Sequence, residues 1–298
     1  MTKIKSGYRF RKQLFPYLLL LPAGLFIIFV IAYPVLMSFR NSFFHEILIR
    51  PWEGTKFVAF SNYFKLLSSG DFWSSFSRTI GWTVSSVIGK TVIGLIIALL
   101  LNKKFRGRGI YRTLILVPWV TPQVIGAIVW KWIYNGEYGM LNYVLIKLGF
   151  LEQGHSWLGN PDTAFLSCLI DDIWVGIPFM SIVFLAGLQA IPQEMYEAAQ
   201  VDGAGKLKQL FFITLPQLKP VFLTATILST IWTFNSFNII WTLTRGGPVN
   251  ATEILVVKTY KTAFQKFNIG LGSTYAVIIF IILMIFSITY WRRFNDEL

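Results

Sequence analysis

Residues 197–220 read EAAQVDGAGKLKQLFFITLPQLKP, a polar stretch between two long apolar runs. Asp202-Gly203 predicts a turn at its centre, because glycine adopts positive φ without steric cost. Apolar residues recur at helical spacing on both sides of this turn; they are Met195, Ala198 and Ala199 before it, and Leu207, Leu210, Phe211 and Leu218 after it. The pattern predicts two short amphipathic helices, a shape suited to docking into a groove on another protein. A connector that lies on the membrane surface is the alternative.

The composition is that of an integral membrane protein. Of the 298 residues, 54% are hydrophobic and only 14% are charged, and the mean hydropathy is +0.57, whereas a soluble domain carries about 25% charged residues. The formal net charge is +13, but the basic residues are spread among loops, so membrane topology explains them better than a nucleic-acid partner. The single cysteine, Cys168, excludes an internal disulfide, and His45 and His155 are too far apart to predict a metal site.

Long apolar stretches predict an all-α fold with six transmembrane helices, since each can cross about 30 Å of hydrocarbon. They lie at residues 15–39, 79–101, 113–135, 163–187, 220–243 and 271–291. The first stretch follows a basic cluster, as in a signal peptide, but it is too long for one and lacks an Ala-x-Ala cleavage site. The cluster consists of Lys3, Lys5, Arg9, Arg11 and Lys12. We therefore expect an uncleaved first span.

The distribution of basic residues predicts the orientation. With both termini in the cytoplasm, the inside segments carry 15 Lys and Arg in 64 residues, and the outside segments carry 10 in 93 residues. The inside segments are 1–14, 102–112, 188–219 and 292–298. This difference agrees with the positive-inside rule. It places the loop 188–219, which contains most of the opening stretch, in the cytoplasm.

Prolines interrupt the third and fourth predicted spans. Pro118 and Pro122 lie in the third and Pro178 in the fourth. Each removes a backbone hydrogen bond and is expected to bend its helix. Carbonyls freed in this way are tolerated only where protein or water covers them, which favours a pathway over a simple anchor.

The opening stretch resembles the "EAA" loop of ABC importer permeases, in which Glu-Ala-Ala, Asp-Gly-Ala and Ile-Thr-Leu-Pro occur at this spacing. The resemblance runs through most of the chain and narrows to carbohydrate-uptake permeases of the maltose and glycerol-3-phosphate type. The supporting stretches are FVAFSNY (57–63), GRGIYRT (107–113), PWVTP (118–122), WKW (130–132), Trp174 with Pro178-Phe179, AGLQ (186–189), Ile191-Pro192 and TRGGP (244–248).

This resemblance implies a type I importer bundle over residues 15–291, including the cytoplasmic loop 188–219. Such permeases work with a second permease subunit, two ATPase subunits and an extracytoplasmic solute-binding protein. The implied cargo is a sugar or oligosaccharide.

The resemblance also implies roles in the loop, where such permeases grip their ATPase. Glu197 would meet a basic residue of the ATPase, Ala198 and Ala199 would allow close approach, and Asp202 with Gly203 would form the turn. The resemblance implies three further contact residues. Leu207 and Leu210 stand where relatives often carry aromatic residues, and Pro216 is the proline of the Ile-Thr-Leu-Pro motif.

No phosphate-binding loop is present in the sequence. Gly89-Lys90-Thr91 matches the end of such a loop, but Val84 stands where its first glycine is required. The resemblance therefore implies that ATP and Mg are bound by the partner ATPases, that this chain holds no cofactor, and that it is not an enzyme.

Three ionisable residues lie at membrane depth, where such residues are costly and usually face the bundle interior or water. Lys90 is in the middle of the second span, and Asp171 and Asp172 lie about a third of the way into the fourth. One interpretation is a contact with the solute or a gate, including an ion pair between Lys90 and a carboxylate. The other is a structural pair, or acids placed at the outer interface.

Polar and aromatic residues alternate in the predicted fifth helix, where Asn235 and Asn238, at i and i+3, would share one face. Amides bond sugar hydroxyls and aromatic rings cover apolar sugar surface. Maltose-type permeases place part of their translocation site on this helix, so the resemblance implies both asparagines as solute contacts. The aromatic candidates are Trp232 and Trp241, with Phe237 between the asparagines and Trp174 in the fourth span. Hydrogen bonding between helices is the alternative.

Two other classes of protein fit the sequence less well. An ion-driven secondary carrier would show paired inverted repeats, and no clear internal repeat is present. A membrane enzyme would need a catalytic constellation, which the two histidines and scattered carboxylates do not supply. Within the importer class, glycerol-3-phosphate or another polar solute stays open: an anion would favour basic residues along the path, and Lys90 alone does not decide the question.

Overall fold

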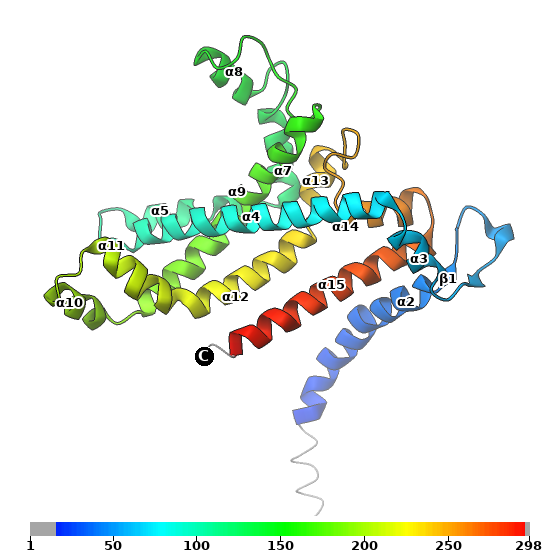
Figure 1. Ribbon diagram of the computed structural model, residues 1–298, viewed down its shortest axis with the longest axis horizontal. Helices are drawn as coiled ribbons and strands as arrows, with labels where there is room; N and C mark the ends of the chain where they lie inside the picture. The colour runs from blue at the N-terminus through cyan, green and yellow to red at the C-terminus, as the bar shows by residue number, and fades with distance from the viewer. Residues whose placement is uncertain (1–15, 296–298) are drawn as a thin grey trace, which may run out of the picture. The chain divides into compact units, whose positions relative to one another are not determined.

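The computed structural model describes residues 16–295, without the side chains of residues 293–295. The basic cluster before residue 15 and the last residues of the segment 292–298 lie outside the described residues. Apart from one two-stranded antiparallel sheet, the described elements are helical (Figure 1). In chain order they include α2 (Tyr33–Ser42), β1 (Phe44–His45), β2 (Lys56–Phe57), α3 (Ser61–Leu67), α4 (Gly70–Asn102), α5 (Arg108–Leu114), α6 (Val117–Val120), α7 (Gln123–Ile133), α8 (Met140–Lys147), α9 (Pro161–Ala190), α10 (Gln193–Val201), α11 (Lys206–Gln209), α12 (Leu215–Phe234), α13 (Phe237–Leu243), α14 (Leu255–Tyr260) and α15 (Ile269–Asn295).

Within the described residues, five continuous helices are long and apolar enough to cross a membrane. They are Pro16–Ser42, Gly70–Asn102, Pro161–Ala190, Lys206–Phe234 and Ile269–Arg292. The region of the predicted third span consists instead of two helical segments, Arg108–Val120 and Gln123–Ile133, bent by 94°. The bend lies at Thr121, whose backbone is extended (φ −68°, ψ 126°), because the following proline disfavours helical geometry in the residue before it.

The fourth apolar stretch, by contrast, forms the single helix α9 with Pro178 in its interior. The helix begins with a side-chain cap: Asn160 accepts a hydrogen bond from the backbone N–H of Asp162 at 3.0 Å. Pro161 occupies the first turn, where its missing N–H costs nothing. Proline therefore breaks one span and is accommodated within another.

The described part of the chain divides into two units, and the first contains residues 16–68 and 259–278. Its strands pair Phe44 with Phe57. Asn62 donates from Nδ2 to the carbonyls of Ser42 and Phe44, both at 2.9 Å. Gly270 lies so close to the Phe44 carbonyl that a Cβ atom there would stand 2.1 Å from its oxygen. These contacts hold the hairpin to the start of α15 within this unit.

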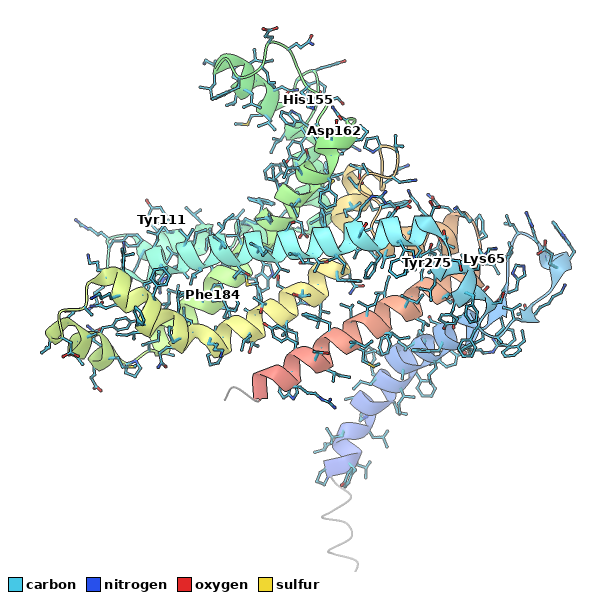
Figure 2. All side chains as sticks on the ribbon, viewed as in Figure 1. Lys65, Tyr111, His155, Asp162, Phe184 and Tyr275 are labelled. Atoms are coloured by element: carbon cyan, nitrogen blue, oxygen red, sulfur yellow. The ribbon has the colours of Figure 1, made fainter. Side chains whose placement is uncertain are left out.

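The second unit contains residues 69–258 and 279–295 and is built around α4, α9 and α12. Membrane helices associate through close packing, to which small residues contribute most. A Cβ atom on Gly94 of α4 would lie 2.5 Å from Cβ of Met180 on α9, and one on Gly187 would lie 2.7 Å from the Leu218 side chain of α12. Phe184 is buried in this core, whereas Tyr111 is exposed (Figure 2).

A second buried cluster surrounds Trp82 of α4. Its indole Nε1 donates to the Thr233 carbonyl at 3.2 Å. One turn earlier, the Thr79 hydroxyl accepts from the backbone N–H of Leu255 at 2.9 Å. These two bonds fix the end of α12 and the start of α14 against α4.

Candidate functional site

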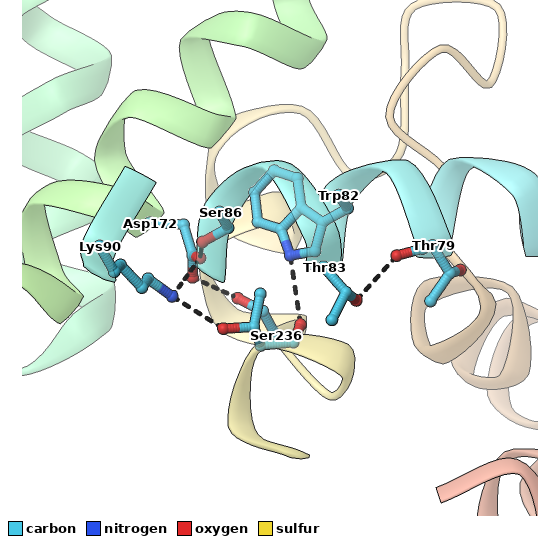
Figure 3. Close-up of polar contacts among 8 residues, drawn as sticks. Thr79, Trp82, Thr83, Ser86, Lys90, Asp172 and Ser236 are labelled. Carbon is cyan, nitrogen blue, oxygen red and sulfur yellow. Dashed lines mark hydrogen bonds and ion pairs between the residues drawn. The ribbon is translucent and has the colours of Figure 1, made fainter. Parts of the chain in front are cut away.

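A buried ion pair joins Lys90 of α4 to Asp172 of α9 (Figure 3). The Lys90 Nζ lies 2.5 Å from Asp172 Oδ2, and the two residues are 6% and 4% exposed. Nζ also donates to the Thr233 hydroxyl at 2.8 Å. The structure therefore pairs Lys90 with Asp172 and not with the neighbouring Asp171.

The Asp172 carboxylate receives two further hydrogen bonds. Ser86 donates to Oδ2, and Ser236 donates to Oδ1 at 3.0 Å. A buried ion pair offsets its desolvation only when its geometry is good and its remaining lone pairs are satisfied. Here both carboxylate oxygens have partners, and the network joins α4, α9, the end of α12 and the residue before α13.

Gly176 makes room for the lysine. A Cβ atom at this position would lie 2.4 Å from Cε and 2.5 Å from Cδ of Lys90. The side chain of Lys90 therefore crosses α9 over a residue that has no side chain. Asp172, one turn before Gly176 on α9, forms the ion pair with the ammonium group of this lysine.

The fifth apolar stretch is broken beside this network. Helix α12 ends at Phe234, Asn235 has φ −99° and ψ 20°, and α13 starts at Phe237. The expectation that Asn235 and Asn238 share a face of one continuous helix is therefore wrong. Asparagine and serine bond nearby backbone groups and therefore favour helix ends. Asn235 donates from Nδ2 to the Ile231 carbonyl at 3.0 Å. The hydroxyl of Ser236, outside both helices, donates to Asp172.

A cavity of about 520 Å³ lies at this break, within the range of roughly 300–1,000 Å³ that is typical of small-molecule sites. Aromatic rings form part of its wall, and the Phe179 and Trp232 rings meet edge to face with centroids 5.0 Å apart. Polar groups lie among these rings, and the amide of Asn238 donates to Gln123 Oε1 at 3.1 Å. The lining thus combines hydrogen-bonding amides with apolar rings.

Four of the seven predicted pathway residues line the cavity; they are Lys90, Trp232, Asn235 and Asn238. Asp171, Trp174 and Trp241 are not among its lining residues. Asp171 is fully buried, and neither of its carboxylate oxygens has a hydrogen-bond partner in the described structure. Trp241 stacks on Phe237, a lining residue, with ring centroids 5.3 Å apart. It therefore packs against the cavity wall without lining the cavity.

Several lining residues were not predicted; they are Trp119, Gln123, Phe179, Thr233 and Ser236. Trp119 and Gln123 flank the bend between α6 and α7, and Thr233 and Ser236 flank the break between α12 and α13. Polar or aromatic residues next to a helix interruption within a span are the sequence signal that could have identified these four residues at the bend and the break.

The stretch 197–220 contains the predicted turn. Gly203 has φ +76°, and its N–H donates to the Gln200 carbonyl at 3.0 Å. The next N–H, of Ala204, donates to the Ala199 carbonyl at 2.8 Å. A left-handed glycine with these bonds ends a helix and satisfies its last carbonyls. On the preceding helix α10, Glu197 and Ala198 are exposed.

The helix after the turn is longer than predicted. Helix α11 continues through a π-helical turn, Leu210–Thr214, into α12, giving one helix over Lys206–Phe234. The expectation of a separate short helix is therefore wrong. Pro216 is the second residue after the π-helical turn, close to where the hydrogen-bond pattern is already shifted. The predicted apolar face is divided: Leu207 is 72% exposed, Leu210 is half-buried, and Leu218 is buried.

The family model described as "Binding-protein-dependent transport system inner membrane component" matches residues 90–297. The matched range contains the ion pair, the helix break and the turn at Gly203. The chain belongs to this family. The permease is 38% identical to the trehalose/maltose transport system permease protein MalF of Thermococcus litoralis, with 99% of each chain covered. It is 36% identical to the sulfoquinovosyl glycerol transport system permease protein SmoG of Agrobacterium fabrum, with 94% of this chain and 90% of that one covered.

A solved structure supports the fold. A chain from the bacterial alginate ABC transporter in complex with alginate pentasaccharide-bound periplasmic protein superposes on the permease with a TM-score of 0.82, at 19% identity, over 95% of this chain and 94% of that one. The expected fold class, the resemblance to ABC importer permeases and the assignment to the inner membrane are confirmed. The family is one of transport components and not of enzymes.

Proposed function

We propose that this permease carries a sugar or oligosaccharide through the cavity at the α12–α13 break. The observation that carries the proposal is the lining itself, where the amides of Gln123, Asn235 and Asn238 lie among aromatic rings. Amides donate to and accept from hydroxyl groups, and ring faces cover the apolar surface of a sugar. The names of the Thermococcus litoralis and Agrobacterium fabrum relatives, which refer to trehalose, maltose and sulfoquinovosyl glycerol, support this class of solute.

A second permease subunit completes the cavity in this proposal. Trp119 and Trp232 line it but remain 54% and 53% exposed. Binding sites usually bury most of a ligand, so a further surface is needed to enclose a solute. An extracytoplasmic solute-binding protein delivers the sugar; the alginate ABC transporter was crystallised in complex with a periplasmic protein that holds an alginate pentasaccharide, which supports this step.

The loop 188–219 faces the cytoplasm in this proposal, together with both termini, and binds the ATPases. Beside the exposed Glu197, the apolar side chains of Val201 and Leu207 are 89% and 72% exposed. Exposed apolar groups rimmed by charge are typical of a protein interface. The two ATPases supply the ATP and Mg sites, and their closure moves the loop and shifts the bundle between two packed states.

Reconstitution tests the proposal. The permease is purified with the second permease, the ATPases and the binding protein encoded beside it, and is placed in lipid vesicles. We expect uptake of labelled sugar that requires both ATP and the binding protein. Glu197→Ala should reduce uptake while the complex still assembles, and Glu152→Ala, an exposed glutamate of the 136–162 loop, serves as the matched control. Uphill uptake driven by an ion gradient without ATP would overturn the proposal in favour of a secondary carrier.

A further inference from the structure

The charges around the cavity carry an inference that rests on the proposed function and narrows its substrate. Of the described residues that line the cavity, Lys90 and Asp172 are the charged ones, and they form an ion pair with each other. The remaining lining groups are amides, hydroxyls, aromatic rings and aliphatic side chains. This wall therefore presents polar groups but no net charge.

We propose that the solute is an uncharged carbohydrate and that Asp172 determines this preference by neutralising Lys90. An anionic solute would need a cation that is free to pair with it, because a charge loses its hydration on entering a bundle. Two of the three N–H donors of Lys90 are directed to Asp172 and Thr233. A carboxylate or phosphate in the cavity would also face the negative charge of Asp172, and like charges brought together across an interface are strongly disfavoured.

The network holds Asp172 in this role. Its two oxygens accept hydrogen bonds from two separate parts of the chain: Ser86 and Lys90 on α4, and Ser236 before α13. Gly176 leaves space for the lysine stem to reach it. The carboxylate is thus fixed beside the lysine and does not swing away to admit a competing anion.

Asp171 provides a matched control. It is the same residue type on the same helix, and it is fully buried, but it is not a lining residue of the cavity and makes no hydrogen bond to Lys90. Replacing either aspartate by asparagine removes one carboxyl group from the bundle. Only the replacement of Asp172 leaves Lys90 without its counter-ion at the cavity wall.

The test measures direct binding to the complex of both permeases and both ATPases in nanodiscs, without the binding protein, so that solute selection by the latter does not enter. The probes are radiolabelled maltose and the same disaccharide with glucuronate in place of one glucose. We expect the wild-type complex to favour maltose by at least about tenfold, since a tenfold ratio needs only a modest free-energy difference. Asp172→Asn should lower this ratio to about one or reverse it, and Asp171→Asn should leave it unchanged.

A charge-balanced variant keeps the test decisive if Asp172→Asn does not assemble. Lys90→Gln/Asp172→Asn removes both charges and should retain the wild-type preference for maltose. Equal binding of the two probes by the wild type, or a loss of preference in this double variant, would overturn the inference. If neither probe binds the wild type, the inference fails, and the proposed function stands or falls with the uptake assay described above. If both probes bind but the wild type does not favour maltose, the inference fails and the proposed function stands.

Discussion

The cavity wall and the loop 188–219 depart from the usual pattern of burial in opposite directions. At the cavity, Lys90 and Asp172 are charged and almost fully buried; in the loop, Val201 and Leu207 are apolar and largely exposed. The buried charges find their partners within this chain, whereas nothing in the described structure covers the exposed apolar groups. The partners of the ion pair thus all come from the same subunit, whereas under the proposed function the exposed apolar groups of the loop meet the surface of an ATPase.

Breaking the ion pair should have the largest effect. Lys90→Met leaves Asp172 buried without a counter-ion, which typically costs about 3–5 kcal/mol of stability. We expect a large drop in the thermal unfolding temperature of the purified permease. Lys90→Met/Asp172→Leu removes both charges and should recover most of the loss. Equal unfolding temperatures for Lys90→Met and the wild type would show that the ion pair does not stabilise this subunit.

Filling the space at Gly176 should have the next largest effect. A Cβ atom there meets the stem of Lys90, and overpacking of this kind typically costs about 1–3 kcal/mol. Gly176→Ala should therefore lower the unfolding temperature, because the lysine has to shift away from Asp172. Gly81→Ala on α4 is the control, since nothing lies within 4 Å of its added methyl group. A Gly176→Ala variant as stable as this control would contradict the packing described.

A change at the loop turn should affect coupling more than folding. Gly203→Ala places a side chain in the left-handed region, at a cost of about 1–2 kcal/mol. Gly205→Ala is its control, because that residue has φ −69° and open space around it. We expect ATP-driven uptake to fall up to about tenfold in Gly203→Ala and to be unchanged in Gly205→Ala, with equal amounts of both proteins in the membrane. Equal uptake by the two variants would remove the requirement for this turn.

The smallest effect is expected at the amides of the cavity. Asn238→Ala removes a hydrogen-bonding group worth about 0.5–1.5 kcal/mol, so solute affinity should fall up to about tenfold while the complex assembles normally. Thr224→Ala, an exposed residue on α12 whose hydroxyl bonds the Pro220 carbonyl, should leave affinity unchanged. Loss of assembly without a change in affinity would mark Asn238 as a contact between helices, through Gln123.

Features set by a few neighbouring residues were predictable from the sequence. Gly203 adopts positive φ because Asp202-Gly203 can turn the chain locally. Lys90 was recognised as a charge at membrane depth that needs a partner. Its pairing with Asp172 was not predictable, because successive residues on a helix point about 100° apart. The choice between Asp171 and Asp172 therefore depends on how α9 is rotated against α4.

Both ends of the helix Lys206–Phe234 were predicted wrongly. Asn235 and Ser236 end α12 through bonds to Ile231 and to the distant Asp172, and the second of these is a tertiary contact that no local pattern reveals. At the other end, the apolar spacing after the Gly203 turn predicted a separate short helix, yet the helix continues through the π-helical turn into the membrane span. Apolar periodicity places helices well, but it does not show where tertiary contacts extend or interrupt them.

The continuous helix Lys206–Phe234 joins the two regions compared above. Its 29 residues correspond to about 44 Å at 1.5 Å per residue, so the loop end and the cavity end of one helix are mechanically connected. Ser236, two residues beyond the end of this helix, donates a hydrogen bond to Asp172 on another helix. When ATPase closure pushes on the loop, as proposed, an axial shift of this helix must move α13 with it or break the Ser236–Asp172 hydrogen bond, so this bond limits how far the helix shifts before the cavity wall rearranges.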